Sequence, residues 1–338
     1  MLAALRRPVL AIVCGPLPLP LPLQALAQRS VSDGTPSSLA YNDLASSPML
    51  RDALRPASEL STVALDYDIH EAASARSALP PLVILHGLLG SRSNNRSVAR
   101  QLAKKLSTPV YCLDLRNHGS SPHSAPHDYQ HLAADVERFI ETHLSDEPPI
   151  LVGHSMGAKT AMAVALRNPK IISGLVPVDN APVAFPPKTG FSSFARYFTA
   201  LKRIENMGPQ CTSLKEADAV LKEVEPSLPI RQFLLTNMRP AANGNGGYTC
   251  RVALDIVEQG LANVAGWPYV APPCMYGGHT LLVRGTKSSY VPDESLPDVA
   301  RFFPRFERLD ITAGHWVVAE QPVAFMAGLT RWLETYYL

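Results

Sequence analysis

From Pro80 onward, short apolar runs alternate with amphipathic segments, and this alternation constrains the fold more than any other feature of the sequence. Apolar runs of roughly four to eight residues that end at Gly or Asp are typical of strands buried on both faces of a sheet. The runs span residues 81–85, 109–113, 149–152, 174–178, 280–283 and 306–311, and the helix-like segments span 95–106, 129–144, 158–168 and 322–336. We therefore expect an α/β fold with a mostly parallel central sheet and helices on both faces.

The block 181–275 interrupts this alternation and has a mostly helical pattern. Within it, apolar residues recur at the spacing of one helix face; they are Phe194, Tyr197, Phe198, Leu201 and Ile204. We expect this block to form a cap that lines a substrate pocket, and the same helix face also suits simple packing on the core. The Asn- and Gly-rich segment 243–247 predicts a turn or hairpin tip.

The composition is that of a folded domain with a sizeable core. Of the 338 residues, 46% are hydrophobic and 18% are charged, which is too little charge for a disordered chain. The formal net charge is +2 and no long basic run is present, so we expect no nucleic-acid partner. The five cysteines form no Cys-x-x-Cys pair, and we expect free thiols, no metal and no cofactor.

The first thirty residues have the composition of a targeting segment. Residues 1–30 contain no Asp or Glu and carry Arg6, Arg7 and Arg29, as is typical of mitochondrial transit peptides. A secretory signal peptide is the alternative, with residues 25–27 as its cleavage site. We expect residues 1–30 to be a targeting peptide and 31–338 the folded domain. The composition leaves the destination open between mitochondria and secretion.

The sequence GHSMG at residues 153–157 matches the G-x-S-x-G pattern of a nucleophile elbow. A predicted strand runs directly into it and a predicted helix leaves it, as this motif requires. The turn lifts Ser155 to the start of a helix, where free N–H groups favour a developing anion. Ser155 is therefore the candidate nucleophile.

A serine hydroxyl needs a base to take its proton. His315 follows the last predicted strand, in a loop ahead of the C-terminal helix, where this kind of fold places the base. An oxyanion hole needs two N–H groups near the nucleophile. One candidate is the backbone N–H of Met156; the other is that of Leu88, in the loop after the first predicted strand.

The acid of a Ser–acid–His triad is less evident. No carboxylate follows the run 280–283 until Asp293. Asp179, however, comes directly after a predicted strand, and we assign it the role of orienting His315. Asp255 and Asp293 are the alternative candidates for the acid.

Two further charged residues stand near these motifs. We expect Asp114 to pair locally with Arg116 and to shape a loop. Lys159 lies in the first turn of the predicted helix, where a cation opposes the helix dipole, and we expect it to pair with a nearby carboxylate.

Several motifs together resemble the abhydrolase-domain-containing protein 11 family of α/β-hydrolases, which also resembles yeast ethanol acetyltransferases and small bacterial esterases. The motifs are HGLLGS (86–91), LDLRNHGSSPH (113–123), LVGHSMGAKTAM (151–162), VDNAP (178–182) and, in the cap, RQFLLTNM (231–238). The resemblance covers about residues 80–335. It implies an α/β-hydrolase fold with a mainly helical cap at 181–275 inserted after the sixth strand. It also implies a triad of Ser155, Asp179 and His315, with Asp255 left open as the acid, and a mitochondrial location.

The expected function is hydrolysis of carboxylic esters or thioesters through an acyl-Ser155 intermediate, on a small-molecule or lipid substrate. One alternative is an alcohol O-acetyltransferase that uses acetyl-CoA, and another is a non-catalytic partner of a mitochondrial enzyme complex. Basic cap residues either meet the phosphates of coenzyme A or form a solvated face; they are Lys188, Arg196, Lys202 and Arg203. Peripheral membrane contact through the cap is also expected.

Overall fold

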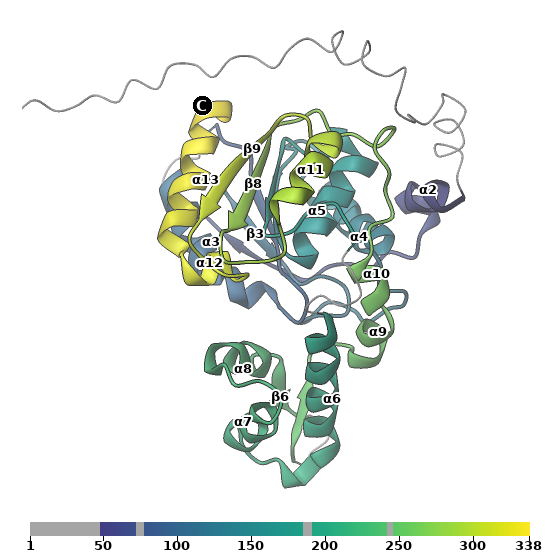
Figure 1. Ribbon diagram of the computed structural model, residues 1–338, viewed down its shortest axis with the longest axis vertical. Helices are drawn as coiled ribbons and strands as arrows, with labels where there is room; N and C mark the ends of the chain where they lie inside the picture. The colour runs from purple at the N-terminus through teal and green to yellow at the C-terminus, as the bar shows by residue number, and fades with distance from the viewer. Residues whose placement is uncertain (1–47, 72–77, 185–190, 242–245) are drawn as a thin grey trace, which may run out of the picture. The chain divides into compact units, whose positions relative to one another are not determined.

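The computed structural model describes residues 48–71, 78–184, 191–241 and 246–338. The expected targeting peptide 1–30 and Lys188 lie outside the described residues, and so does most of the expected hairpin tip at 243–247. The described residues form a sheet covered by helices, together with a mainly helical insertion (Figure 1).

The central sheet has seven strands in the order β1-β3-β2-β4-β5-β8-β9. All pair in parallel except β1 (Tyr67–His70), which runs antiparallel to β3 at one edge. The other strands are β2 (Leu82–Leu85), β3 (Val110–Leu113), β4 (Ile150–His154), β5 (Gly174–Val178), β8 (Thr280–Gly285) and β9 (Phe306–Ile311). The mostly parallel sheet predicted from the apolar runs is thus confirmed. The sequence of β1, YDIH, has a single apolar aliphatic residue, and no apolar run marked it as a strand.

Helices cover both faces of the sheet (Figure 1). On one face, α3 (Arg96–Leu106) and α13 (Pro322–Tyr337) share a hydrophobic cluster with the strands. The buried residues of α3 form one stripe at helical spacing; they are Val98, Ala99, Leu102, Ala103 and Leu106. On the other face, α4 (Tyr129–His143), α5 (Met156–Arg167) and α11 (Leu296–Phe302) pack in a second cluster.

The insertion lies between β5 and β8. Its elements are α6 (Phe191–Met207), α7 (Leu214–Lys222), α8 (Leu228–Leu235), the antiparallel pair β6 (Met238–Pro240) and β7 (Tyr248–Cys250), α9 (Leu254–Gln259) and α10 (Leu261–Ala265). Tyr197, Phe198, Leu201 and Ile204 of α6 are all buried, as their spacing predicted. The strand counted as the sixth in the family numbering is β5, the fifth strand in the described part of the chain.

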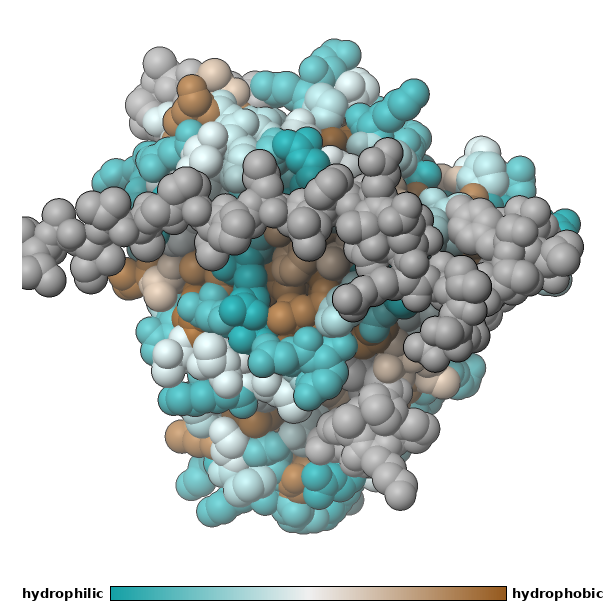
Figure 2. All heavy atoms as spheres, turned by 45° about the horizontal axis from the view of Figure 1, so that its top comes forward, coloured by the Kyte–Doolittle hydropathy of each residue, from teal (hydrophilic) through white to brown (hydrophobic). Residues whose placement is uncertain are grey.

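The remaining elements are short. They are α2 (Pro48–Ala53), α12 (Val317–Glu320) and the 3-10 turns η2 (Ala57–Glu59), η3 (Arg92–Asn95), η4 (Pro169–Ile171), η5 (Gly208–Gln210) and η6 (Asp293–Ser295). On the face shown in Figure 2, hydrophilic side chains predominate and hydrophobic ones gather in a smaller central area. Among the described residues, no helix combines the length and the apolar character needed to cross a bilayer.

The predicted pairing of Asp114 with Arg116 is wrong. Asp114 accepts hydrogen bonds from the backbone N–H and the guanidinium of Arg92. Arg116 is fully buried and pairs with Asp135 of α4. Asn117 and Gly119 adopt positive φ angles of 67° and 60°, so the chain turns sharply after Arg116. Asp114 therefore pairs with η3, and Arg116 pairs with α4.

Candidate active site

Ser155 lies at the turn between β4 and α5, with φ 54° and ψ −115°. This strained conformation is held by its surroundings. A Cβ added to Gly153 would lie 2.1 Å from the carbonyl oxygen of Gly157, and one added to Gly157 would lie 2.4 Å from that of Leu85. Only glycine fits at both positions, so the tight turn predicted from G-x-S-x-G is physically required.

The structure brings Ser155, His315 and Asp179 together from the ends of three strands. The hydroxyl of Ser155 lies 3.0 Å from Nε2 of His315, and Nδ1 of His315 lies 2.8 Å from Oδ2 of Asp179. A carboxylate only accepts hydrogen bonds, so Nδ1–H donates to Asp179. Nε2 of the neutral ring is then left to accept the Ser155 proton. This is the geometry that acyl transfer by a serine requires.

Asp179 is fully buried and its carboxylate is satisfied by other groups from the same edge of the sheet. Oδ1 accepts the backbone N–H of Gly285 at 2.9 Å, and Oδ2 also accepts the hydroxyl of Ser288. Both donors belong to the segment at the end of β8. Asp179 has φ 52°, a conformation that short polar side chains tolerate better than most. The segment that lacks an acid thus supplies the donors that hold the acid from β5.

The imidazole of His315 lies between two other rings. Tyr290 stacks on it, with 3.8 Å between ring centroids and 17° between planes. His154 lies 4.8 Å away, and its Nε2–H donates to the backbone carbonyl of His315 at 2.7 Å. Burial lowers the pKa of His154 to about 4, so this ring is neutral near pH 7. These contacts fix both the ring and the backbone of His315.

The two expected oxyanion donors lie beside Ser155. Met156 begins α5, so its N–H has no partner within the helix, and Leu88 lies in the facing loop. In the part of the chain that the structure describes, neither N–H donates to a protein acceptor. Asn180 donates from Nδ2 to the backbone carbonyl of Ser155 at 3.0 Å, which fixes the turn. Both N–H groups are therefore placed to receive a charged substrate oxygen.

Buried neutral histidines hold the loop that carries Leu88. Nδ1–H of His86 donates to Gly87, while its Nε2 accepts the backbone N–H of Leu115. Nε2 of His118 accepts the N–H of Leu89. Burial lowers the pKa of His86 to about 4 and that of His118 to about 3. These contacts give both rings a structural role in the loop.

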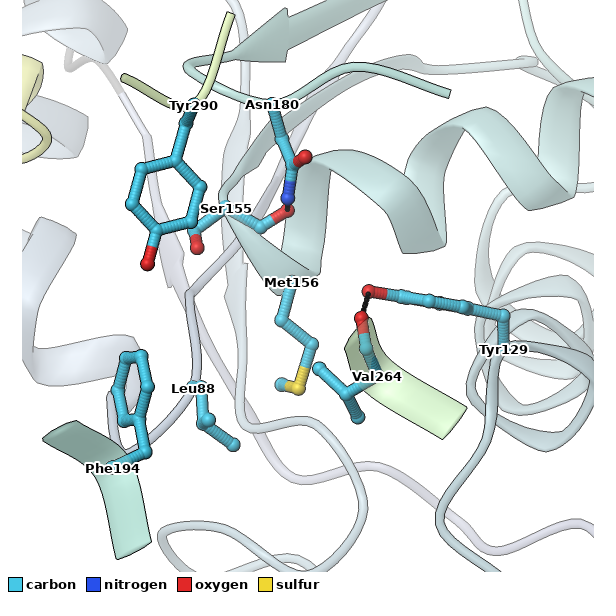
Figure 3. A pocket seen from close by; sticks show the side chains of 8 residues that line it. All are labelled: Leu88, Tyr129, Ser155, Met156, Asn180, Phe194, Val264 and Tyr290. Carbon is cyan, nitrogen blue, oxygen red and sulfur yellow. Dashed lines mark hydrogen bonds between the residues drawn. The ribbon is translucent and has the colours of Figure 1, made fainter. Parts of the chain in front are cut away.

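A small pocket opens beside the Ser155 hydroxyl (Figure 3). Its volume is about 10 Å³, which leaves room for about one water molecule. Tyr290 and Phe194 lie on one side of it, and Met156, Val264 and Tyr129 on the other. Most of these side chains are apolar, as is usual for a site that binds an acyl group. Phe194 and Val264 come from α6 and α10, so the insertion contributes to the pocket wall.

The structure separates Asp255 from this site. Its side chain is 81% exposed and pairs with Lys202, which also pairs with Glu258. Arg203 pairs with Glu223. The other alternative candidate, Asp293, pairs with Arg284. Two of the cap cations considered for coenzyme A phosphates are therefore already neutralised by carboxylates.

Sequence analysis missed Ser288, Tyr290 and the role of His154. Ser288 and Tyr290 follow β8 in a loop without a recognisable motif. The one available signal was the missing acid in that loop. Among the described residues, no group of three or more His, Cys, Asp or Glu side chains is arranged to hold a metal ion. The four described cysteines are buried free thiols.

The comparisons with known proteins agree with this geometry. The family model described as "alpha/beta hydrolase fold" matches residues 80–203. A "Probable alcohol acetyltransferase" of Saccharomyces cerevisiae is 42% identical, with 80% of this chain and 84% of the relative covered. An "sn-1-specific diacylglycerol lipase ABHD11" of Xenopus tropicalis is 38% identical, with 81% and 83% covered. Among solved structures, a "Marine microorganism esterase" has a TM-score of 0.73 at 28% identity, covering 80% of this chain and 100% of that one. The chain therefore belongs to the abhydrolase-domain-containing protein 11 family of α/β-hydrolases.

Proposed function

We propose that this enzyme cleaves carboxylic esters or thioesters through an acyl-Ser155 intermediate. The observation that carries the proposal is the unbroken line of hydrogen bonds from Ser155 through His315 to Asp179, with distances of 3.0 Å and 2.8 Å. In that line Ser155 is the nucleophile, His315 the base and Asp179 the group that orients His315 and stabilises its charged form.

Acylation begins when the Ser155 oxygen attacks the acyl carbon and Nε2 of His315 takes the hydroxyl proton. The negative charge that develops on the substrate oxygen meets the N–H groups of Leu88 and Met156. The bond to the leaving alcohol or thiol then breaks, and His315 returns its proton to that group. Water repeats the sequence on the acyl-enzyme, releasing a carboxylic acid and free Ser155.

The second candidate is acyl transfer to an alcohol, as the name of the yeast relative suggests. An alcohol in place of water in the second step gives an ester with the same proton transfers. Ser155 is only 8% exposed, and the apolar pocket around it favours an alcohol over bulk water. Because Lys202 and Arg203 are paired with carboxylates, this candidate does not depend on them to hold a coenzyme A phosphate.

One experiment separates these candidates. The full chain is assayed in three separate reactions: with p-nitrophenyl acetate, with acetyl-CoA in the presence and absence of ethanol, and with a fluorophosphonate probe that labels active serines. We expect aryl ester cleavage and labelling that Ser155→Ala abolishes and that Ser97→Ala, at an exposed helix position, leaves unchanged. Ethyl acetate formed only by the unmodified protein would establish the transferase. If labelling and turnover survive Ser155→Ala, the proposed function through Ser155 is wrong. If the unmodified protein shows neither, the non-catalytic partner role takes precedence.

We also propose a mitochondrial location and peripheral membrane contact through the cap. The acid-free segment 1–30 supports the location, and import of the full chain into isolated mitochondria with removal of that segment tests it. Leu214 and Leu228, which begin α7 and α8, are 45% and 50% exposed. These two exposed leucines support the membrane contact. Co-sedimentation of the unmodified protein and of Leu214→Ser/Leu228→Ser with phosphatidylcholine vesicles tests it, and vesicle binding retained by the double variant would contradict it.

A further inference from the structure

Three successive backbone carbonyls at the end of α10 are held by two side chains of the hydrolase core. Val264 accepts the hydroxyl of Tyr129 at 2.8 Å. The ammonium of Lys159 donates to Gly266 at 3.0 Å and to Ala265 at 3.4 Å. The last carbonyls of a helix have no partner within it. Tyr129 and Lys159 supply those partners from outside the insertion, and we call this pair with its three carbonyls the α10 clamp.

Lys159 ties the clamp to the nucleophile turn. It lies in α5, and its backbone N–H donates to the carbonyl of Ser155 at 3.2 Å. Its side chain is fully buried and lies over the ring of Tyr129, with 5.7 Å between Nζ and the ring centroid. Backbone carbonyls at the end of α10 are thus among the hydrogen-bond acceptors of its ammonium. Burial lowers its pKa to about 7, and such a buried cation is costly for the fold.

The side chain of Val264 faces the pocket beside Ser155, next to Met156 (Figure 3). The leaving group must lie near His315, which returns a proton to it, and Tyr290 stacks on His315. Figure 3 shows Val264 and Met156 on the side of the pocket opposite Tyr290. The acyl chain of a bound ester therefore points toward Val264, and a long chain would have to displace it.

We propose that the α10 clamp fixes Val264 as the end wall of the acyl pocket and so restricts Ser155 to short acyl groups. The inference rests on the proposed function and concerns which ester that function accepts. It makes Val264 a specificity-determining residue, and Tyr129 and Lys159 positioning residues that act through it.

The test is a series of p-nitrophenyl esters from acetate to decanoate, with kcat/KM measured for each. We expect the full-length protein to prefer acetate to butyrate. Val264→Ala, Tyr129→Phe and Lys159→Met should each raise the ratio of octanoate to acetate turnover by about tenfold, since a methylene-sized change in an apolar pocket is worth roughly 10–200-fold. A purely structural loss would lower turnover of every ester alike and leave that ratio unchanged.

A matched control exists at Tyr337, whose hydroxyl donates to the carbonyl of Ser173 at 2.8 Å. Tyr337→Phe removes the same kind of bond but should leave the ratio unchanged. Fluorophosphonate labelling of each variant separates the two proposals. Without labelling of the unmodified protein, the function itself is wrong. With labelling intact, the clamp would be overturned if the octanoate-to-acetate ratios of Val264→Ala and Tyr129→Phe equalled that of the unmodified protein. It would also be overturned if the unmodified protein turned over octanoate as fast as acetate. If Lys159→Met does not fold, these other two variants decide.

Discussion

The hydroxyl of Ser288 and Nδ1–H of His315 donate to the same oxygen, Oδ2 of Asp179. Ser288 belongs to the loop after β8, where the sequence offers no carboxylate, and Asp179 follows β5, the neighbouring strand. The end of β8 and the loop after it therefore supply hydrogen-bond donors to the carboxylate of Asp179, and no carboxylate of their own. An oxygen that accepts two donors and is shielded from solvent keeps one orientation toward His315.

Ser288→Ala should lower kcat by about tenfold and leave KM nearly unchanged, because a hydrogen bond to a charged group is worth roughly 1.5–3 kcal/mol and Gly285 N–H still holds Oδ1. Steady-state kinetics with an aryl acetate measures both constants. Ser295→Ala is the matched control, since its hydroxyl donates to Pro292 in the next turn of the same segment. An unchanged kcat, with or without a rise in KM, or an equal loss of kcat in the control, would refute this role of Ser288.

Asp179→Asn should lower kcat by roughly 10³–10⁴-fold, as replacement of the acid does in triads of this kind. Asp255→Asn should change kcat less than about twofold, because Asp255 is exposed and pairs with Lys202. Rates of both variants with the same aryl ester decide between the two carboxylates. A large loss in Asp255→Asn with an active Asp179→Asn would reverse the assignment.

The parts of this site that follow from local sequence were predictable. The turn around Ser155 depends on glycines within two residues of it, and Asp179 and His315 each follow a strand that ends at the same sheet edge. That these side chains lie close together can be predicted from the strand order and from the rule that ligands bind at the carboxyl ends of parallel strands.

The rest depends on contacts that no local pattern encodes. Lys159 donates a hydrogen bond to the carbonyl of Gly266, which lies more than a hundred residues further along the chain. The strand β1 pairs with β3 through its backbone, and its sequence contains no apolar run that would predict a strand. Asp114 and Arg116 are two residues apart in sequence, yet each pairs with a side chain from a different element: Asp114 with Arg92 of η3, and Arg116 with Asp135 of α4.

Gly157→Ala should lower the free energy of unfolding by about 3 kcal/mol or more and abolish turnover. The added methyl would lie 2.4 Å from the carbonyl oxygen of Leu85, so β2 or α5 must move. Gly277→Ala, where nothing lies within 4 Å of the added methyl, is the control and should have little effect. Urea unfolding of the three proteins measures this, and equal stabilities would show that the elbow tolerates a side chain.

Stability should fall as the pH drops below about 6.5. Burial lowers the pKa of His86 and His154 to about 4 and those of His118 and His127 to about 3. Between these values and 6.5 the unfolded chain binds protons that the folded chain does not bind. The stability contributed by the neutral imidazoles is therefore fully present above pH 6.5 and is lost as the pH falls toward 3. Burial raises the pKa of Asp114 and Asp135, which opposes this trend in part.

Urea unfolding at pH 7, 6, 5 and 4 gives the slope of stability against pH, which can reach about 5 kcal/mol per pH unit for four protons. His127→Phe should flatten that slope by about one quarter, whereas His123→Phe, at an exposed position, should not change it. A slope that is unaffected by His127→Phe would mean that this ring does not titrate on unfolding as proposed.

Tyr290→Leu should slow reaction of Ser155 with a fluorophosphonate by about tenfold, because an aromatic pair is worth roughly 0.5–1.5 kcal/mol beyond its area and the stack fixes the ring of His315. Tyr290→Phe keeps the ring and should restore most of the rate. The probe needs His315 to activate Ser155 but needs little of the substrate pocket, so its rate reports on the base directly. If Tyr290→Phe is as slow as Tyr290→Leu, the hydroxyl matters more than the stack. If both react at the unmodified rate, Asp179 and the backbone contact from His154 suffice to hold the base.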